Sequence, residues 1–234
     1  MNDGRTLGVL LLDTHFPRPP GDIGSADTFA APVRFHVVQG ACANDVVSSV
    51  SSLRASELPA RFVSAARLLQ AAGVAAITTS CGFLVALQAQ LQAAVAVPVV
   101  SSALLWLPQL LKTEQQVGVL TFDAASLGSA HLLCAGVPQE RLADVLIEGM
   151  PAGSEFVRGI RGDDPQMDLA LARGEVVTAA QALKARAPTL RTLVFECTNM
   201  PPYAQDVEQA TGLRTLSLLQ HPAVRWAVDD TLHP

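Results

Sequence analysis

The sequence predicts an α/β fold of two pseudo-symmetric lobes, each a three-layer αβα unit with a mainly parallel four-stranded sheet, and an active site in the cleft between them. Apolar runs of strand length alternate with segments of helical period, which is typical of α/β proteins. The chain also repeats itself, because the run that ends at Cys81 recurs 116 residues later at Cys197, and residues 8–13 recur at 118–123. A repeat of this length predicts two related halves.

The first half is expected to contain four strands and the helices that cover them. Residues 7–12 form a continuous apolar run, which indicates a central parallel strand covered on both faces. Residues 16–28 are rich in Pro, Gly and Asp and predict a loop, either on the surface or as a flap over the cleft. Further strands are predicted at residues 32–38, 74–77 and 95–101, and helices at 56–73 and 82–91.

The second half is expected to follow the same plan after a connecting helix at residues 102–112. Residues 151–165 are rich in Gly and Asp and predict a loop. We expect the first lobe to comprise residues 1–103 with 219–234, and the second lobe residues 104–218. The strands of the second half are predicted at residues 116–122, 141–148, 192–196 and 213–218, and the helices at 124–136, 165–187, 201–210 and 221–232.

The composition limits the class of protein. The net charge is −5 and only 16% of the 234 residues are charged, so we expect neither a nucleic-acid partner nor a membrane partner. The first five residues and the short apolar run behind them differ from the layout of a signal peptide, which predicts a cytoplasmic location. The four cysteines lie far apart without a Cys-x-x-Cys pair, which argues against a zinc site and, in a reducing compartment, against disulfides.

Cys81 stands where an apolar strand gives way to a helical pattern, and Cys197 stands at the matching place in the second half. Backbone N–H groups and the positive end of a helix dipole at such a junction favour a thiolate. Two cysteines that face each other across a cleft can invert a carbon centre, because one removes a proton and the other returns one from the opposite side. Cys81 and Cys197 are therefore the candidate catalytic residues, although a single cysteine is more commonly an inert residue of the core.

Polar residues beside the two cysteines are candidates for binding a substrate. Thr79, Ser80, Gly82, Thr198 and Asn199 bring hydroxyl and amide groups that suit a carboxylate and a developing enolate. The same residue types also suit helix caps, so both interpretations stay open.

With these residues the chain resembles the aspartate/glutamate/hydantoin racemase superfamily, whose members work without pyridoxal phosphate. The resemblance covers nearly the whole chain, and it depends on residues 8–13 and 118–121, on Thr79-Ser80-Cys81-Gly82, and on Glu196-Cys197-Thr198-Asn199-Met200-Pro201. The chain departs from glutamate racemases after both cysteines. Gly82-Phe83 stands where they carry Asn-Thr, and Thr198-Asn199 where they carry Thr-His.

The resemblance implies roles for two further residues. In the family an aspartate at the place of Asp13 contacts the amino group of the substrate, and a threonine at the place of Thr121 binds its carboxylate. From the residues alone, Asp13 is equally well a turn or cap residue. Relatives tend to be dimers, so the resemblance also points to a homodimer.

The leading prediction is a cofactor-independent isomerase of amino acid metabolism, a racemase or epimerase that inverts the α-carbon of an amino acid or a related carboxylate or hydantoin. Its partner would be a small carboxylate or hydantoin-like substrate. Alternatives within the family are a maleate-type isomerase and an arylmalonate-type decarboxylase. Outside the family they are a hydrolase that uses Cys81 with His15, which would leave Cys197 unexplained, and a two-lobed protein that binds a small ligand without turnover.

Overall fold

A computed structural model describes residues 4–229 and 231, and in this part of the chain the strands form two four-stranded sheets, one in each half. The first sheet has the order β2-β1-β3-β4, and all of its pairings are parallel. Its central strands are almost fully buried, as expected where helices cover both faces of a sheet. The strands are β1 (Leu7–Leu12), β2 (Val33–Val38), β3 (Ala76–Thr79) and β4 (Val99–Val100).

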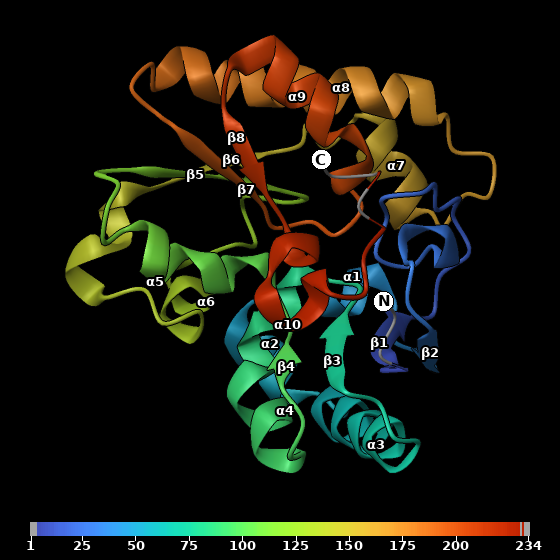
Figure 1. Ribbon diagram of the computed structural model, residues 1–234. Helices are drawn as coiled ribbons and strands as arrows, with labels where there is room; N and C mark the ends of the chain where they lie inside the picture. The colour runs from blue at the N-terminus through green and yellow to red at the C-terminus, as the bar shows by residue number, and fades with distance from the viewer. Residues whose placement is uncertain (1–3, 230, 232–234) are drawn as a thin grey trace.

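The second sheet repeats this topology with the order β6-β5-β7-β8, again entirely parallel. Figure 1 shows the first sheet in the lower half of the view and the second sheet above it. The predicted fold class is therefore confirmed, since both halves are parallel four-stranded sheets with flanking helices. The strands are β5 (Val117–Thr121), β6 (Val145–Gly149), β7 (Thr192–Phe195) and β8 (Arg214–Leu216).

The helices of the first half precede and follow β3 and β4. Helix α3 packs against β1 and β2, and its buried positions recur on one face. The α-helices are α1 (Ala43–Val46), α2 (Val50–Ala55), α3 (Leu58–Ala71), α4 (Gln88–Ala94) and α5 (Leu107–Leu110), and 3-10 helices occupy Ala26–Thr28, Gly82–Leu87 and Ala103–Trp106.

In the second half the long helix α8 packs against β5 and β6, while α9 packs against α8 and β8. After β8 the chain returns to the first sheet, where α10 contacts β3 and β4 and the Ala30 amide donates to the Ala227 carbonyl at 2.9 Å. The α-helices are α6 (Ser129–Cys134), α7 (Glu155–Arg161), α8 (Leu169–Arg186), α9 (Ala204–Thr211) and α10 (Pro222–Arg225), and 3-10 helices occupy Gln139–Asp144, Pro201–Tyr203 and Leu218–Gln220.

The structure corrects several predicted elements. The segment 151–165, expected to be a loop, contains α7, because the Ser154 side chain caps the helix and the Glu175 carboxylate accepts from the amides of Glu155 and Phe156. The predicted helix 124–136 forms only over Ser129–Cys134, and the predicted strand 95–101 only over Val99–Val100. The start of the predicted strand 141–148 is a 3-10 turn. Part of the predicted helix 221–232 lies outside the described residues.

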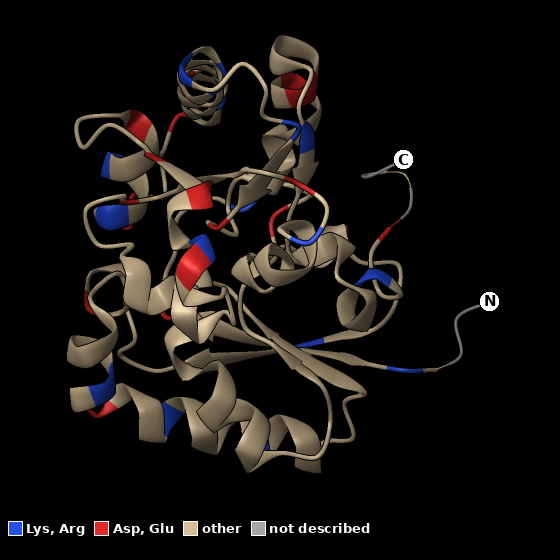
Figure 2. Ribbon diagram, turned by 90° about the vertical axis from the view of Figure 1, so that its left-hand side faces the viewer, with Lys and Arg blue, Asp and Glu red and all other residues tan. Residues whose placement is uncertain are grey.

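Acidic and basic side chains are mixed over the outer helices and loops instead of gathering into a patch of one sign (Figure 2). Within the described part of the chain, none of the helices combines the length and the apolar character needed to cross a membrane. The buried positions are occupied mainly by aliphatic residues and phenylalanine, in two clusters. One surrounds the first sheet and extends to Val117, Val119 and Val194 of the second, and the other contains Leu120, Leu193 and Phe195 of the second sheet.

Candidate active site

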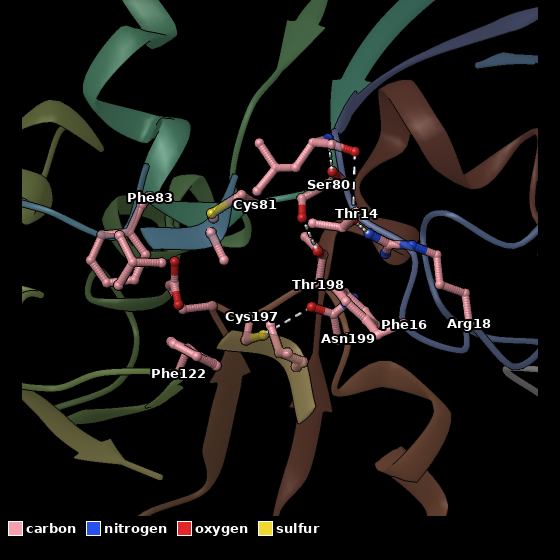
Figure 3. Close-up of a pocket in the computed structure, with 16 residues that line it drawn as sticks. Thr14, Phe16, Arg18, Ser80, Cys81, Phe83, Phe122, Cys197, Thr198 and Asn199 are labelled. Carbon is pink, nitrogen blue, oxygen red and sulfur yellow. Dashed lines mark hydrogen bonds between the residues drawn. The ribbon is translucent and has the colours of Figure 1, made fainter. Parts of the chain in front are cut away.

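A small pocket lies between the lobes, at the carboxyl ends of the strands, where open α/β sheets bind their ligands. It is lined by residues that follow β1, β3, β5 and β7, including Thr14, Cys81, Phe122 and Cys197. Figure 3 shows the side chains of Cys81 and Cys197 entering it from opposite strands. The repeat therefore brings both thiols to one cavity.

The two cysteines reach the pocket because each strand continues for one residue in the same way. The Ser80 amide donates to the Leu10 carbonyl at 3.0 Å, and the Glu196 amide donates to the Leu120 carbonyl at 2.9 Å. These bonds extend the β3–β1 and β7–β5 ladders to the residue before each cysteine. Cys81 and Cys197 then point inward, with exposed fractions of 9% and 7%.

The two strand ends cross each other closely. The Thr198 hydroxyl donates to the Ser80 carbonyl at 2.7 Å, which links the lobes beside the pocket. At the matching place in the first half, a Cβ atom added to Gly82 would overlap the carbonyl oxygen and the Oε1 atom of Glu196. Gly82 is therefore required by the approach of Glu196, which explains why this chain carries glycine after its first cysteine.

Glu196 brings a buried carboxyl group to the pocket wall. Its side chain is 1% exposed, and its Oε2 atom accepts from the Thr121 hydroxyl at 2.8 Å. Among the described residues, none forms a hydrogen bond with its Oε1 atom. Burial raises the pKa of Glu196 to about 7, although the Thr121 hydroxyl and the Phe122 amide act in the opposite direction.

Burial also raises the pKa of both pocket thiols. It raises the pKa of Cys81 well above its usual value, and the nearby carboxyl of Glu196 raises it further. The amides of Phe83 and Leu84 and the guanidinium of Arg18 lower the pKa of Cys81, but by less. The structure thus opposes the expectation that the strand end favours a thiolate, because desolvation outweighs the effect of the amides.

Cys197 has different surroundings. Burial and Glu196 raise its pKa, and the charges of Cys81 and Asp22 add to the rise, while the Asn199 amide lowers it. Its sulfur lies 3.5 Å from Asn199 Oδ1, to which the thiol donates. The two thiols are close enough for the charge of one to affect the other, but they do not experience the same field.

The side of the pocket away from Phe83 and Phe122 is polar and includes the guanidinium group of Arg18. Arg18 lies over the Phe16 ring at 4.4 Å, pairs with the buried Asp22 at 2.9 Å and donates to the Thr14 hydroxyl at 2.8 Å. The Asn199 amide group donates to the other Asp22 oxygen at 2.7 Å. The loop 16–28 is therefore anchored into the pocket wall, where it contributes Phe16 and Arg18.

The predicted binding residues divide into two groups. Ser80, Gly82, Thr198 and Asn199 line the pocket beside the cysteines. Asp13, Thr79 and Thr121 do not.

Each of these three side chains is engaged elsewhere. The Asp13 carboxylate accepts from the Gly40 amide at 3.0 Å, the Thr79 hydroxyl donates to the carbonyls of Cys81 and Ser101, and the Thr121 hydroxyl donates to Glu196. Asp13 thus acts as a turn residue, and Thr121 positions a carboxyl group instead of reaching into the pocket.

Sequence reasoning missed the aromatic residues of the pocket, Phe16, Phe83 and Phe122, and the carboxyl of Glu196. The rings carry no sequence signal, because phenylalanine is equally common in a core. Glu196 did carry one, since it is a lone acidic residue at the end of an apolar strand, directly before the candidate cysteine.

His15 does not serve Cys81 as a base. Its Nδ1 atom contacts the Asp163 carboxylate at 2.7 Å, its side chain is 75% exposed, and it does not line the pocket. The geometry that a Cys-His hydrolase would need is therefore not formed at Cys81.

Comparison with known proteins gives consistent relatives by sequence, while no family model matches the chain. A dimethylsulfoniopropionate lyase from Durusdinium sp. clade D is 32% identical over 218 residues, which cover 89% of this chain and 69% of the relative. Dimethylsulfoniopropionate lyase 3 from Emiliania huxleyi is 30% identical over 90% of this chain, which spans 56% of the longer relative.

Solved structures with the same fold are more distant in sequence. Glutamate racemase RacE1 from Bacillus anthracis superposes with a TM-score of 0.60 at 16% identity, covering 94% of this chain and 79% of that one. Unliganded arylmalonate decarboxylase superposes with a TM-score of 0.54 at 14% identity, covering 91% and 86%. The resemblance to the racemase superfamily therefore holds at the level of the fold.

The sequence relatives overturn the predicted activity. They are named as lyases, so the expectation of an isomerase of amino acid metabolism, a racemase or epimerase, was wrong. The error arose because the prediction carried an activity over together with the fold, whereas the reaction depends on the residues around the sulfur atoms.

Proposed function

The chain belongs to the dimethylsulfoniopropionate lyase family, and from that premise we propose that it cleaves dimethylsulfoniopropionate into dimethyl sulfide and acrylate. The observation that carries the proposal is the similarity of 89% of the chain to a lyase of that name. The pocket supports it, because two thiols and a buried carboxyl group surround a cavity suited to a small molecule.

The reaction is a β-elimination that needs one base. The base removes a proton from the carbon beside the carboxylate, and the electrons of that C–H bond form the new carbon–carbon double bond. The bond from the next carbon to the sulfonium sulfur breaks, and its electron pair leaves with the sulfur. The products are acrylate and neutral dimethyl sulfide, and the proton passes from the base to solvent.

The proposed base is a thiolate at one of the two pocket cysteines. A positive charge that enters a buried site lowers the pKa of nearby thiols, so the sulfonium group itself favours the thiolate that the empty pocket disfavours. An elimination does not require a second acid on the opposite face. The unequal surroundings of Cys81 and Cys197 therefore suit elimination better than inversion, in which the two sulfurs exchange roles.

We expect the polar side of the pocket to receive the carboxylate end of the substrate, beside the contacts that Arg18 and Asn199 make with Asp22. Thr14, Arg18 and Asn199 lie together on one side of the pocket (Figure 3). Hydrogen bonds and positive charge at the carboxylate would stabilise the enolate-like charge that develops as the proton leaves.

The test is direct measurement of both products. Purified protein is incubated with dimethylsulfoniopropionate, dimethyl sulfide is measured by gas chromatography, and acrylate by proton NMR. We expect equimolar products from the wild type and none above background from the Cys81→Ser/Cys197→Ser double variant. A Cys42→Ser/Cys134→Ser variant is the matched control, because these thiols lie outside the pocket and should leave activity unchanged. Folded wild-type protein that releases no dimethyl sulfide would refute the proposal.

A further inference from the structure

Glu196 is a buried ionisable group of the pocket to which the elimination itself assigns no role. Proton removal requires one thiol, and the polar side of the pocket faces the substrate carboxylate. The Glu196 carboxyl nevertheless lines the cavity at 1% exposure, with Oε1 unpaired among the described residues. A carboxyl group left without a partner in a dry site is costly, which indicates that a ligand supplies what the protein does not.

The chemistry of the missing partner follows from what surrounds Oε1. Within the described pocket lining, Arg18 is the one basic side chain, and it is already paired with Asp22. Figure 3 places Arg18 on the opposite side of the pocket from Phe83 and Phe122. Glu196 belongs to the Phe122 side, because Thr121 and Phe122 contact its carboxyl group. A cation bound between these rings would therefore meet Glu196 and not Arg18.

Aromatic rings beside a carboxylate oxygen that accepts no hydrogen bond suit an onium cation best. An onium group carries positive charge but has no N–H or O–H to donate, so hydrogen-bond acceptors in fixed directions add little. It is attracted instead by aromatic faces and by the field of a nearby carboxylate. Phe83, Phe122 and Glu196 together provide both.

Two features show that the site is built around this carboxyl group. Gly82 leaves the space that Glu196 occupies, since any side chain at that position would overlap it. The Thr121 hydroxyl holds Oε2 at 2.8 Å, which fixes the orientation of the group and leaves Oε1 without a hydrogen-bond partner among the described residues. At the equivalent position of the first half, Ser80 uses its only side-chain oxygen to accept from the Leu12 amide.

We propose that Glu196 is the specificity residue that binds the sulfonium group, with Phe83 and Phe122 beside it, so that the pocket selects onium carboxylates over carboxylates of the same shape whose other end is uncharged. This inference rests on the lyase function proposed above. It sets the orientation of the substrate, with the sulfonium at the Glu196 side, the carboxylate at the Arg18 side, and the carbon that loses its proton between the two sulfurs.

The experiment compares two ligands that differ only in charge. The first ligand is 3-(trimethylammonio)propionate, and the second is its carbon isostere 4,4-dimethylpentanoate, in which an uncharged tert-butyl group replaces the ammonium group. Binding of each is measured by calorimetry on the full chain. We expect the wild type to bind the cationic ligand at least about tenfold more tightly. Glu196→Gln, which retains the hydrogen bond with Thr121, should abolish the preference, whereas Glu196→Asp, which retains the charge, should keep it.

Glu114→Gln is the matched control. Glu114 also accepts from a threonine hydroxyl, that of Thr192 at 2.8 Å, and also has one unpaired buried oxygen, but it lies outside the pocket. This variant should keep the wild-type preference. Wild-type protein that binds both ligands equally would overturn the assignment without any variant, and so would a preference that survives in Glu196→Gln.

The outcome separates the two proposals. Protein that releases dimethyl sulfide but binds both ligands equally retains the lyase function and loses the role of Glu196. Protein that prefers the cationic ligand but releases no dimethyl sulfide retains the onium site and loses the lyase function.

Discussion

The two strand ends that meet in the pocket share a backbone path and differ in side chains. Before Cys81, the Ser80 hydroxyl is satisfied by the Leu12 amide at 2.9 Å. Before Cys197, Glu196 places a carboxyl group in the same setting and keeps one oxygen unpaired. The repeated fold thus supplies two equivalent positions for sulfur. The residues at which the halves differ place a carboxyl group on one side of the pocket and a guanidinium group on the other, so the site is one-sided in charge.

That one-sidedness indicates the kind of reaction. Inversion of a carbon centre needs two groups that exchange the roles of acid and base, so it favours matched surroundings. Elimination is directional, because it has one base and one leaving group. A site with Glu196 on one side and Arg18 on the other distinguishes the two ends of a substrate.

The largest expected effect is the loss of kcat/KM when either pocket cysteine is replaced, and the two losses are compared. Cys81→Ser and Cys197→Ser are assayed separately for release of dimethyl sulfide. Loss of the general base should lower kcat/KM by about 10²–10⁴-fold. Because only one sulfur takes the proton, we expect the two losses to differ by at least about tenfold. Equal losses would support a mechanism in which both thiols transfer protons.

The next prediction concerns Gly82, which follows Cys81 as Thr198 follows Cys197. Gly82→Ala forces Glu196 away from the Cβ atom and shifts the strand end that carries Cys197. We expect kcat/KM to fall by about 100-fold, the scale of a misplaced catalytic group. Gly174→Ala is the control, because this glycine lies inside α8 with open space around its Cα, and alanine there should raise stability. Undiminished activity of Gly82→Ala would contradict the close crossing of the strand ends.

Glu196 should also cost stability in the empty protein. The folded pKa of about 7 lies above the ordinary 4.5, so the folded state binds the proton more tightly. Stability therefore falls as pH rises from about 4.5 to about 7, by roughly 3 kcal/mol at about 1.4 kcal/mol per pH unit.

Glu196→Gln removes this loss, since glutamine has no charge to bury. Denaturant unfolding at pH 4 and pH 8 should show nearly equal stabilities at the lower pH and a more stable variant at the higher pH. A variant that is less stable than the wild type at pH 8 would show that burial of the Glu196 carboxylate does not destabilise the folded protein.

The smallest expected effect concerns the contact between the lobes at the pocket edge. Asp163 has a φ of 50°, and its carboxylate accepts from the amides of His15 and Phe16 and pairs with the His15 ring. The hydrogen bond and charge of Asp163 raise the pKa of His15, so the charged pair is complete below the ordinary pKa of 6.5 and is lost as pH rises through the raised value.

Asp163→Asn isolates this pair, because asparagine tolerates the same backbone conformation and still accepts from the amides. We expect KM to rise about twofold to threefold, on the scale of an exposed ion pair. The wild-type KM should increase with pH above neutrality, and that of the variant should not. Parallel pH profiles would show that the pair does not influence the pocket.

Much of the fold could be predicted from the sequence. The repeat located both cysteines at strand ends, and the apolar runs located the eight strands of the described sheets, although β4 proved to be much shorter than expected. Helix α7 was missed, because its cap depends on Glu175, which comes from a different helix. Binding residues were harder to predict, since Asp13 and Thr121 have the expected positions but their side chains bond to other partners.

What the sequence by itself determined was the architecture, because the period of apolar residues and the internal repeat are properties of the chain that do not depend on contacts. Only the tertiary structure decided that one carboxyl oxygen of Glu196 has no partner among the described residues, that Gly82 makes room for this side chain and that Arg18 lies on the opposite side of the pocket from Phe83 and Phe122. The physical reason is that charge, solvation and steric fit arise between groups from both lobes, and they exist only once the strand ends have crossed.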